Sequence, residues 1–231
     1  MVGQLIRSDS TLNDDRVLCV FTAVKNPGLL DKLHLHGVKS SAHLTVLISH
    51  TTLSIEHNGV TSDLPASDIG AVELRGEKDV VLHFAPAHQD RFGFASHLDA
   101  VEFVGAVQLI QHVDVLRQAS SDSSSIFLQH VKNTHEYAEQ LWSLVLWKES
   151  YTYFDFVETL EIVLKEMDQE AVDMESIQET LAALCSRFAK QVLPEKTVEV
   201  DSVMHVSISP LGVLVAKVKA LQLHAQSQCK D

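Results

Sequence analysis

The chain has 231 residues, of which 45% are hydrophobic and 21% charged, and this excludes a disordered tail, a collagen-like fibre and a charge-rich coiled coil. Its 31 acidic and 18 basic side chains give a net charge of −13, which disfavours nucleic acid and anionic lipid because both require cationic contacts. No apolar run approaches the roughly 18 residues of a membrane span, and no signal peptide is visible. The three scattered cysteines include no CxxC pair, so we expect no disulfide framework or thiolate zinc site and a reducing, cytoplasmic location.

The hydrophobic pattern changes its period at a serine-rich stretch in the middle of the chain. Before this stretch apolar residues mostly alternate with a period of two, and after it they recur with a period near 3.6. Residues 119–125 contain five serines and have the composition of a linker. We therefore expect an α+β protein with a strand-rich domain over 1–118, a linker over 119–125 and a mainly helical domain over 126–231.

About seven short strands are expected in the first domain, where eight runs are candidates. Asn58-Gly59 predicts a hairpin turn, because both residues tolerate a positive φ. The candidate strands are β-rich or alternating runs separated by Gly, Pro and Asn, and they cover 16–24, 33–37, 43–49, 52–57, 60–64, 69–74, 80–84 and 91–95.

A helix is predicted to close the first domain. Ser96 and Asp99 have the spacing of a capping box, in which each side chain accepts a hydrogen bond from the backbone amide of the other. The helix is expected to continue to Leu116, with Phe103 on its apolar stripe. Strands followed by one helix resemble the pleckstrin-homology-like superfold, in which a bent antiparallel barrel is plugged by a C-terminal helix.

This resemblance covers roughly residues 14–116 and is closest over residues 90–103. There the chain looks like the aromatic-rich last strand and the Asp-Ala-x-x-Phe helix start of EVH1-type and clathrin-adaptor-associated members, with Asp99, Ala100 and Phe103 at the matching positions. No family within the superfold is identified. The alternative is another small α+β domain that ends in a strand, a cap and a helix.

The second half predicts four helices and one strand. Asp173 is a candidate N-cap and Pro194 a helix terminator, while Ser209-Pro210 is typical of an N-cap followed by Pro at the first helical position. A β-hairpin around Pro210 is the alternative to the last helix. The expected helices cover 126–148, 153–167, 173–193 and 210–225, and the expected strand covers 197–207.

Motifs that carry catalysis or hold cofactors are absent from the sequence. There is no GxSxG, no P-loop and no GxGxxG, and we predict a protein that is not an enzyme and has no cofactor. His34 and His36 share one face of a probable strand, but no third metal ligand is fixed beside them. The acidic run from Glu158 to Glu179 lacks the Glu-x-x-His pairs of di-iron bundles, so we interpret it as a solvated helix face.

Lipid and proline-motif recognition are both weakly supported. A phosphoinositide-binding pleckstrin domain uses a cationic cluster in its first loop, where this chain has only the widely spaced Lys25, Lys32 and Lys39. EVH1-type recognition of proline-rich peptides requires an early Trp, whereas both tryptophans follow the linker.

The densest aromatic patch of the chain lies between the first two predicted helices of the second half. Core packing between these helices would explain the patch. However, its apolar residues surround the helix on all sides, whereas core packing requires an apolar stripe on one side only. Aromatic side chains also anchor interfaces. The candidate partner-binding residues are Trp142, Trp147, Tyr151, Tyr153 and Phe154.

Together these features favour a non-catalytic protein–protein interaction module, an adaptor or a subunit of an intracellular assembly. Its expected partner is another protein or a second copy of the chain. The alternatives are a membrane-recruited phosphoinositide binder and a histidine-based metal site or enzyme.

Overall fold

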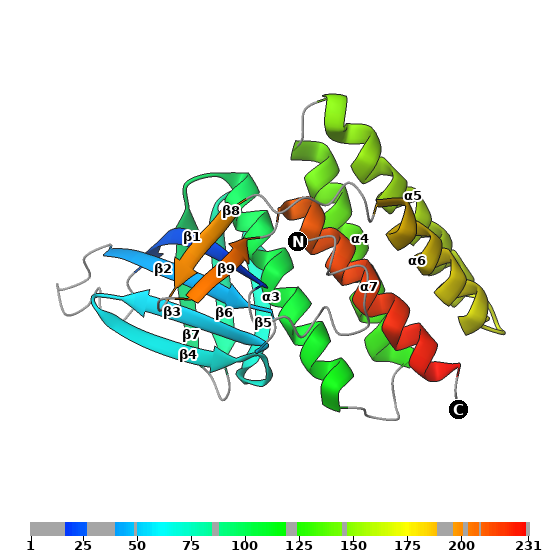
Figure 1. Ribbon diagram of the computed structural model, residues 1–231, viewed down its shortest axis with the longest axis horizontal. Coiled ribbons are helices and arrows are strands. Elements are labelled where there is room, and N and C mark those ends of the chain that lie inside the picture. Colours follow the sequence, from blue (N-terminus) through cyan, green and yellow to red (C-terminus); the bar gives the residue numbers. More distant parts are fainter. Residues whose placement is uncertain are drawn as a thin grey trace. The chain divides into compact units, whose positions relative to one another are not determined.

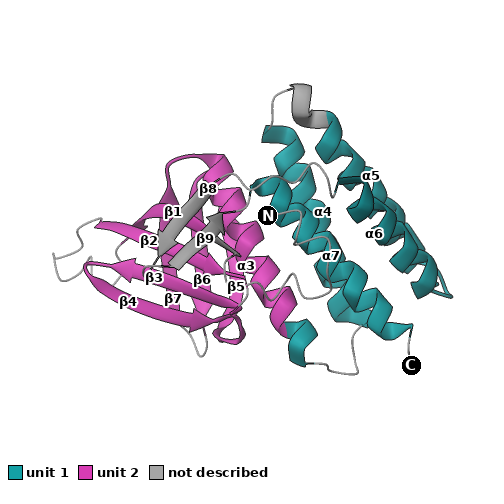
Figure 2. Cartoon of the chain, in the orientation of Figure 1, with its two compact units in different colours: residues 1–12, 115–197, 208–231 teal, residues 13–114, 198–207 magenta. Residues whose placement is uncertain are grey.

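The computed structural model describes residues 17–26, 40–48, 50–84, 88–118, 124–144, 147–188, 196–200, 203–207 and 209–229, with only the backbone described at 17–18, 147–150, 196–200 and 203–207. The chain divides into two compact units (Figure 2). The sheet unit contains residues 13–114 and 198–207, and the helical unit contains residues 1–12, 115–197 and 208–231.

In the part of the chain that the structure describes, the sheet unit is built on seven antiparallel strands in the order β4-β3-β2-β1-β7-β6-β5 (Figure 1). The order leaves β4 and β5 at the two ends of the sheet, so the expected barrel is open between them. Each strand overlaps a run predicted from the sequence, while the run predicted over 33–37 lies outside the described residues. The strands are β1 (Val17–Asn26), β2 (Ser40–Leu47), β3 (Thr52–His57), β4 (Val60–Pro65), β5 (Ile69–Arg75), β6 (Asp79–Phe84) and β7 (His88–Phe94).

Two local signals in this unit have the predicted geometry. Asn58 and Gly59 connect β3 to β4 with φ values of 54° and 75°, as a tight hairpin requires. The Asp99 amide donates to Ser96 Oγ over 3.0 Å, and the Ser96 amide donates to Asp99 Oδ2 over 3.1 Å. The predicted capping box is therefore confirmed, and it starts α3 (His97–Gln118).

Helix α3 closes the core of the sheet unit through an aromatic cluster. The Phe103 ring is buried and lies 5.1 Å from Phe94 on β7 and 5.3 Å from Phe21 on β1, measured between ring centroids. Further along the helix, the Gln111 side-chain amide donates to the Ile69 carbonyl of β5 over 2.8 Å. The helix thus contacts the two central strands β1 and β7 and the end strand β5.

A late segment of the chain joins the sheet. The strand expected over 197–207 is two strands, β8 (Lys196–Val200) and β9 (Val203–Ser207), which pair with each other. Strand β9 also pairs in parallel with the start of β1, with Val17 opposite Val206 and Leu18 opposite Ser207. Residues 198–207 therefore belong to the sheet unit, although they lie in the segment where the sequence predicted a helical domain.

The described residues of the helical unit form four long helices. Their caps match the predictions: Asp173 Oδ1 accepts from the amides of Glu175 and Ser176, and Ser209 Oγ accepts from the Gly212 amide. The last helix is thus confirmed, and the hairpin alternative is wrong. The helices are α4 (Ser124–Leu144), α5 (Trp147–Met167), α6 (Met174–Phe188) and α7 (Pro210–Gln228).

Two predicted boundaries are wrong. Ser124 and Ser125 belong to α4, because serine at a helix start does not oppose helix formation. The interruption expected after Lys148 is not found there, because Lys148, Glu149 and Ser150 all belong to α5. The α+β fold class is confirmed.

Ring contacts and ion pairs place the four helices as an up-down-up-down bundle. Trp142 meets Phe154 between α4 and α5, and His135, seven residues earlier, meets Glu161, seven residues later. These two helices are therefore antiparallel. Helices α4 and α7 are antiparallel for the same reason, because Phe127 packs on His224 and Tyr137 on Lys217. Helices α5 and α6 are separated only by the short stretch from Met167 to Met174, and Phe156 near the start of α5 packs on Phe188 at the end of α6, so this pair is antiparallel as well.

Candidate functional site

Among the described residues, three aromatic side chains remain at the surface where α4 ends and α5 begins. Trp142 is 41% exposed, Phe154 is 40% exposed and Tyr151 is 65% exposed. The Trp142 and Phe154 rings meet across the two helices, with centroids 5.3 Å apart and an interplanar angle of 56°. We call Trp142, Tyr151 and Phe154 the aromatic cluster.

The structure separates the five residues predicted as partner-binding. Tyr153 is only 7% exposed and lies on the core side of α5, as does the fully buried Phe156. Trp147 is in α5, but its side chain lies outside the described residues. The helical period explains why some of these rings are exposed and others buried. Residues 151 and 154 are three apart and share one face of α5, while 153 and 156 share another.

Carboxylates continue this surface along the seam between α4 and α5. His135 Nδ1 lies 3.5 Å from Glu139 Oε2, and His135 Nε2 lies 4.0 Å from Glu161 Oε1. Given the antiparallel register of the two helices, Glu139 and Glu158 lie one turn from the Trp142–Phe154 pair. The sequence indicates a solvated face for the acidic run, but it carries no sign that part of this run borders the aromatic cluster.

The amine of Lys217 is buried between α4 and α7. Lys217 is 2% exposed, and its Nζ lies 5.4 Å from the Tyr137 ring centroid. Burial lowers the pKa of Lys217 to about 7, although the nearby Glu136 acts in the opposite direction. Burial also lowers the pKa of His130 to about 4, with further contributions from Lys217 and His224.

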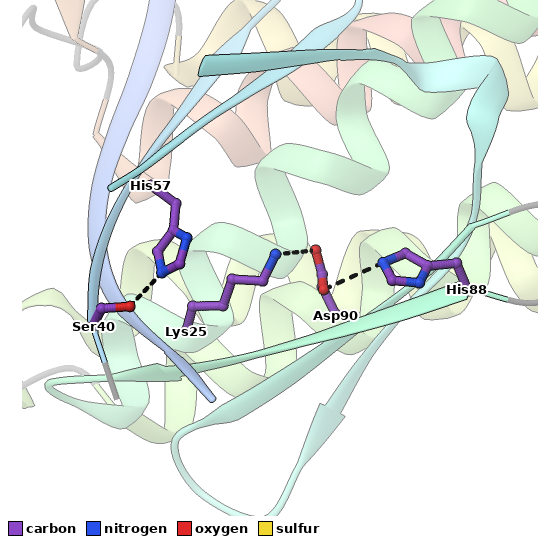
Figure 3. Close-up of polar contacts among 5 residues, drawn as sticks. All are labelled: Lys25, Ser40, His57, His88 and Asp90. Carbon is purple, nitrogen blue, oxygen red and sulfur yellow. Dashed lines mark hydrogen bonds and ion pairs between the residues drawn. The ribbon is translucent and has the colours of Figure 1, made fainter. Parts of the chain in front are cut away.

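One end of the sheet unit carries polar residues on its inward-facing positions. Inward positions alternate along each strand and are apolar in the middle of the sheet, as with Leu44 and Val46 of β2. The same alternation at the strand ends gives Lys25 on β1, Ser40 on β2, His57 on β3, and His88 and Asp90 on β7, which Figure 3 shows together.

These polar residues are already paired with one another. Lys25 Nζ donates to Asp90 Oδ2 over 2.8 Å, and His88 Nε2 lies 3.4 Å from Asp90 Oδ1. Ser40 Oγ and His57 Nε2 share a hydrogen bond. Of the three lysines considered for phosphate binding, Lys25 is therefore neutralised by a carboxylate, and Lys32 and Lys39 lie outside the described residues.

The cysteines and other candidate metal ligands do not converge on a reactive centre in the described part of the chain. Burial raises the thiol pKa of Cys19 and of Cys185 to about 12, so both remain protonated at neutral pH. Among the described residues no group of three or more His, Cys, Asp or Glu could hold a metal ion. None of the described helices is long and apolar enough to cross a membrane.

Comparison with known proteins gives a partial structural likeness and no family. No family model matches the chain, and no curated protein matches it. Inner membrane complex sub-compartment protein 3 of Toxoplasma gondii is similar over 48% of this chain and 82% of its own, at 15% identity and a TM-score of 0.32. At that TM-score we draw no argument from the likeness. The strand order and the closing helix α3 are compatible with a pleckstrin-homology-like fold.

Proposed function

We propose that this chain is a non-catalytic protein-interaction module, acting as an adaptor or subunit of a larger intracellular assembly. The partner binds at the aromatic cluster of the helical unit. The observation that carries this proposal is the Trp142–Phe154 pair, whose two rings pack on each other while each remains about two-fifths exposed.

The bundle core does not need these rings. Tyr153, Phe156 and Leu160 of α5 already fill the buried side of that helix. Large apolar surfaces are normally removed from water, and a Trp beside other aromatic residues is typical of the few positions that dominate an interface. The cluster is therefore better suited to a partner than to the stability of the bundle.

The charge around the cluster favours a protein partner over a lipid surface. Residues 124–188 contain 12 acidic and four basic side chains, a net charge of −8. An anionic membrane repels such a surface, because peripheral binding relies on Lys and Arg near the headgroups. A protein surface can supply both apolar and cationic groups.

Capture experiments with single substitutions test this proposal. The tagged full chain is incubated with an extract of its source cells, alongside Trp142→Ala and Phe154→Ala. We expect a specific partner to bind the wild type about 30-fold more tightly than Trp142→Ala, the equivalent of ~2 kcal/mol for an interface anchor.

The matched controls remove apolar groups that are exposed elsewhere. Val60→Ala lies on β4 and Val172→Ala lies between α5 and α6. Both should retain the partner. A partner that binds the two cluster variants as well as it binds the wild type would contradict the assignment of this surface.

A further inference from the structure

The exposed surface between α4 and α5, which we call the seam, changes in character along the length of the two helices. At one level Trp142 faces Phe154, and two turns further along α5 Glu161 faces His135 of α4. Glu139 and Glu158 lie at the level between them, because each is three or four residues from the aromatic pair. The surface therefore changes from apolar to acidic within about 11 Å, the rise of two helical turns.

Few described cations offset these carboxylates. Glu161 lies 3.5 Å from Lys165, an exposed pair of the kind that contributes little. Glu139 has His135 beside it, and no ion pair of Glu158 is found with a described residue. A partner that brings cations to this part of the seam meets carboxylates whose charge is largely uncompensated.

We propose that the occupant of this seam is a basic amphipathic helix, an inference that rests on the proposed function of the aromatic cluster. One bulky apolar residue of the partner contacts Trp142 and Phe154. Lys or Arg residues one and two turns along the same face meet the carboxylates of Glu139, Glu158 and Glu161. A helix fits because its side chains recur at the 5.4 Å spacing that separates the levels of the seam.

Charge also disfavours a second copy of the chain as the occupant of the whole seam. A second copy whose own seam covered this one along its whole length would bring Glu139 and Glu158 of one chain near the same carboxylates of the other. Like charges opposed across an interface are destabilising. The basic helix avoids this repulsion and adds electrostatic steering to its association.

A peptide selection tests this inference on the full chain. A displayed library of random peptides of about 16 residues, roughly four helical turns, is selected on the wild type and counter-selected on the Trp142→Ala/Phe154→Ala variant. We expect the enriched peptides to be basic, with a bulky apolar residue followed by Lys or Arg at i+3 or i+4 and at i+7. Their affinity should fall about tenfold or more between 50 and 500 mM salt, because the ion pairs are exposed.

Charge reversal identifies the carboxylates involved. For an enriched peptide, Glu139→Lys/Glu158→Lys should weaken binding at least about tenfold, while Glu170→Lys/Glu179→Lys, which makes the same charge change elsewhere, should change it less than about threefold. Circular dichroism establishes that both variants remain folded.

The outcomes separate this inference from the proposed function. Enriched peptides that depend on Trp142 but are neutral or acidic would leave the aromatic cluster as a binding site and overturn the basic-helix occupant. Equal effects of the two charge-reversal pairs would also overturn it. If no peptide is enriched through Trp142 and Phe154, while the capture experiment still finds a partner lost in Trp142→Ala, the helical occupant is wrong and the proposed function stands.

Discussion

Replacing Lys217 by Met should stabilise the helical unit, and the gain should shrink as the pH rises. The Lys217 amine is buried against Tyr137 between α4 and α7, and burial lowers its pKa from 10.5 to about 7. Above pH 10.5 the amine is neutral in both the folded and the unfolded chain. As the pH falls from 10.5 towards 7, the unfolded chain takes up a proton that the folded chain does not, and the free energy of unfolding decreases.

The size of this effect follows from the pKa difference. Each unit of pKa shift corresponds to about 1.4 kcal/mol, so the charged lysine costs roughly 4 kcal/mol at pH 7 and roughly 2 kcal/mol at pH 9. The difference in unfolding free energy between Lys217→Met and the wild type should therefore decrease by roughly 2 kcal/mol over that interval. A methionine of similar length avoids a cavity, so packing adds only a pH-independent offset.

The unfolding free energies of Lys217→Met and the wild type can be measured by urea unfolding followed by tryptophan fluorescence. This signal reports on the helical unit, because the two tryptophans lie in α4 and α5. Lys132→Met, an exposed lysine on α4, is the matched control and should show no such pH dependence. A stability difference for Lys217→Met that stays constant from pH 7 to pH 9 would refute the reasoning that an amine is desolvated at this position.

Three other predictions concern separate parts of the chain. Phe103→Ala should destabilise the sheet unit by roughly 3–5 kcal/mol in thermal unfolding, because its buried ring joins Phe94 and Phe21, and a loss below ~1 kcal/mol would contradict the closing role of α3. His130→Gln should reduce the loss of stability between pH 6.5 and 4, since the neutral form of His130 is favoured in the folded state and only the unfolded chain takes up a proton in that interval. The protein should not sediment with anionic liposomes at physiological salt, and saturable binding that Lys25→Ala abolishes would reverse this expectation.

Helix starts and turns that are stabilised by residues close in the sequence could be predicted from the sequence alone. The capping box at Ser96, the Asn58-Gly59 turn and the caps at Asp173 and Ser209 each satisfy backbone groups within three or four residues. Such signals do not depend on the rest of the fold. The break between α4 and α5 carries no such signal, because the chain is apolar and free of Gly and Pro around residues 144–147.

Features that depend on distant contacts could not be predicted in this way. The aromatic patch was visible in the sequence, but its division into the exposed Trp142 and Phe154 and the buried Tyr153 depends on how α4 and α5 are rotated against each other. Lys217 is flanked by apolar residues on every side of α7, which in retrospect indicates burial. An isolated lysine in an apolar helix does not by itself reveal which side will be covered.

The pairing of β9 with β1 is the least local feature of the fold, and it predicts where the chain loses protection when β9 is removed. Replacing residues 203–207 by Gly and Ser residues of the same number keeps the chain length but abolishes the parallel pairing with Val17 and Leu18. Each lost backbone hydrogen bond is worth about 1 kcal/mol, so amide exchange over residues 17–18 should accelerate roughly fivefold or more. Residues 23–26 pair with β7 and provide an internal control, because their exchange should not change. Unchanged exchange over 17–18 would show that β9 does not protect the start of β1, while acceleration over both segments would show that the hairpin stabilises the whole sheet unit.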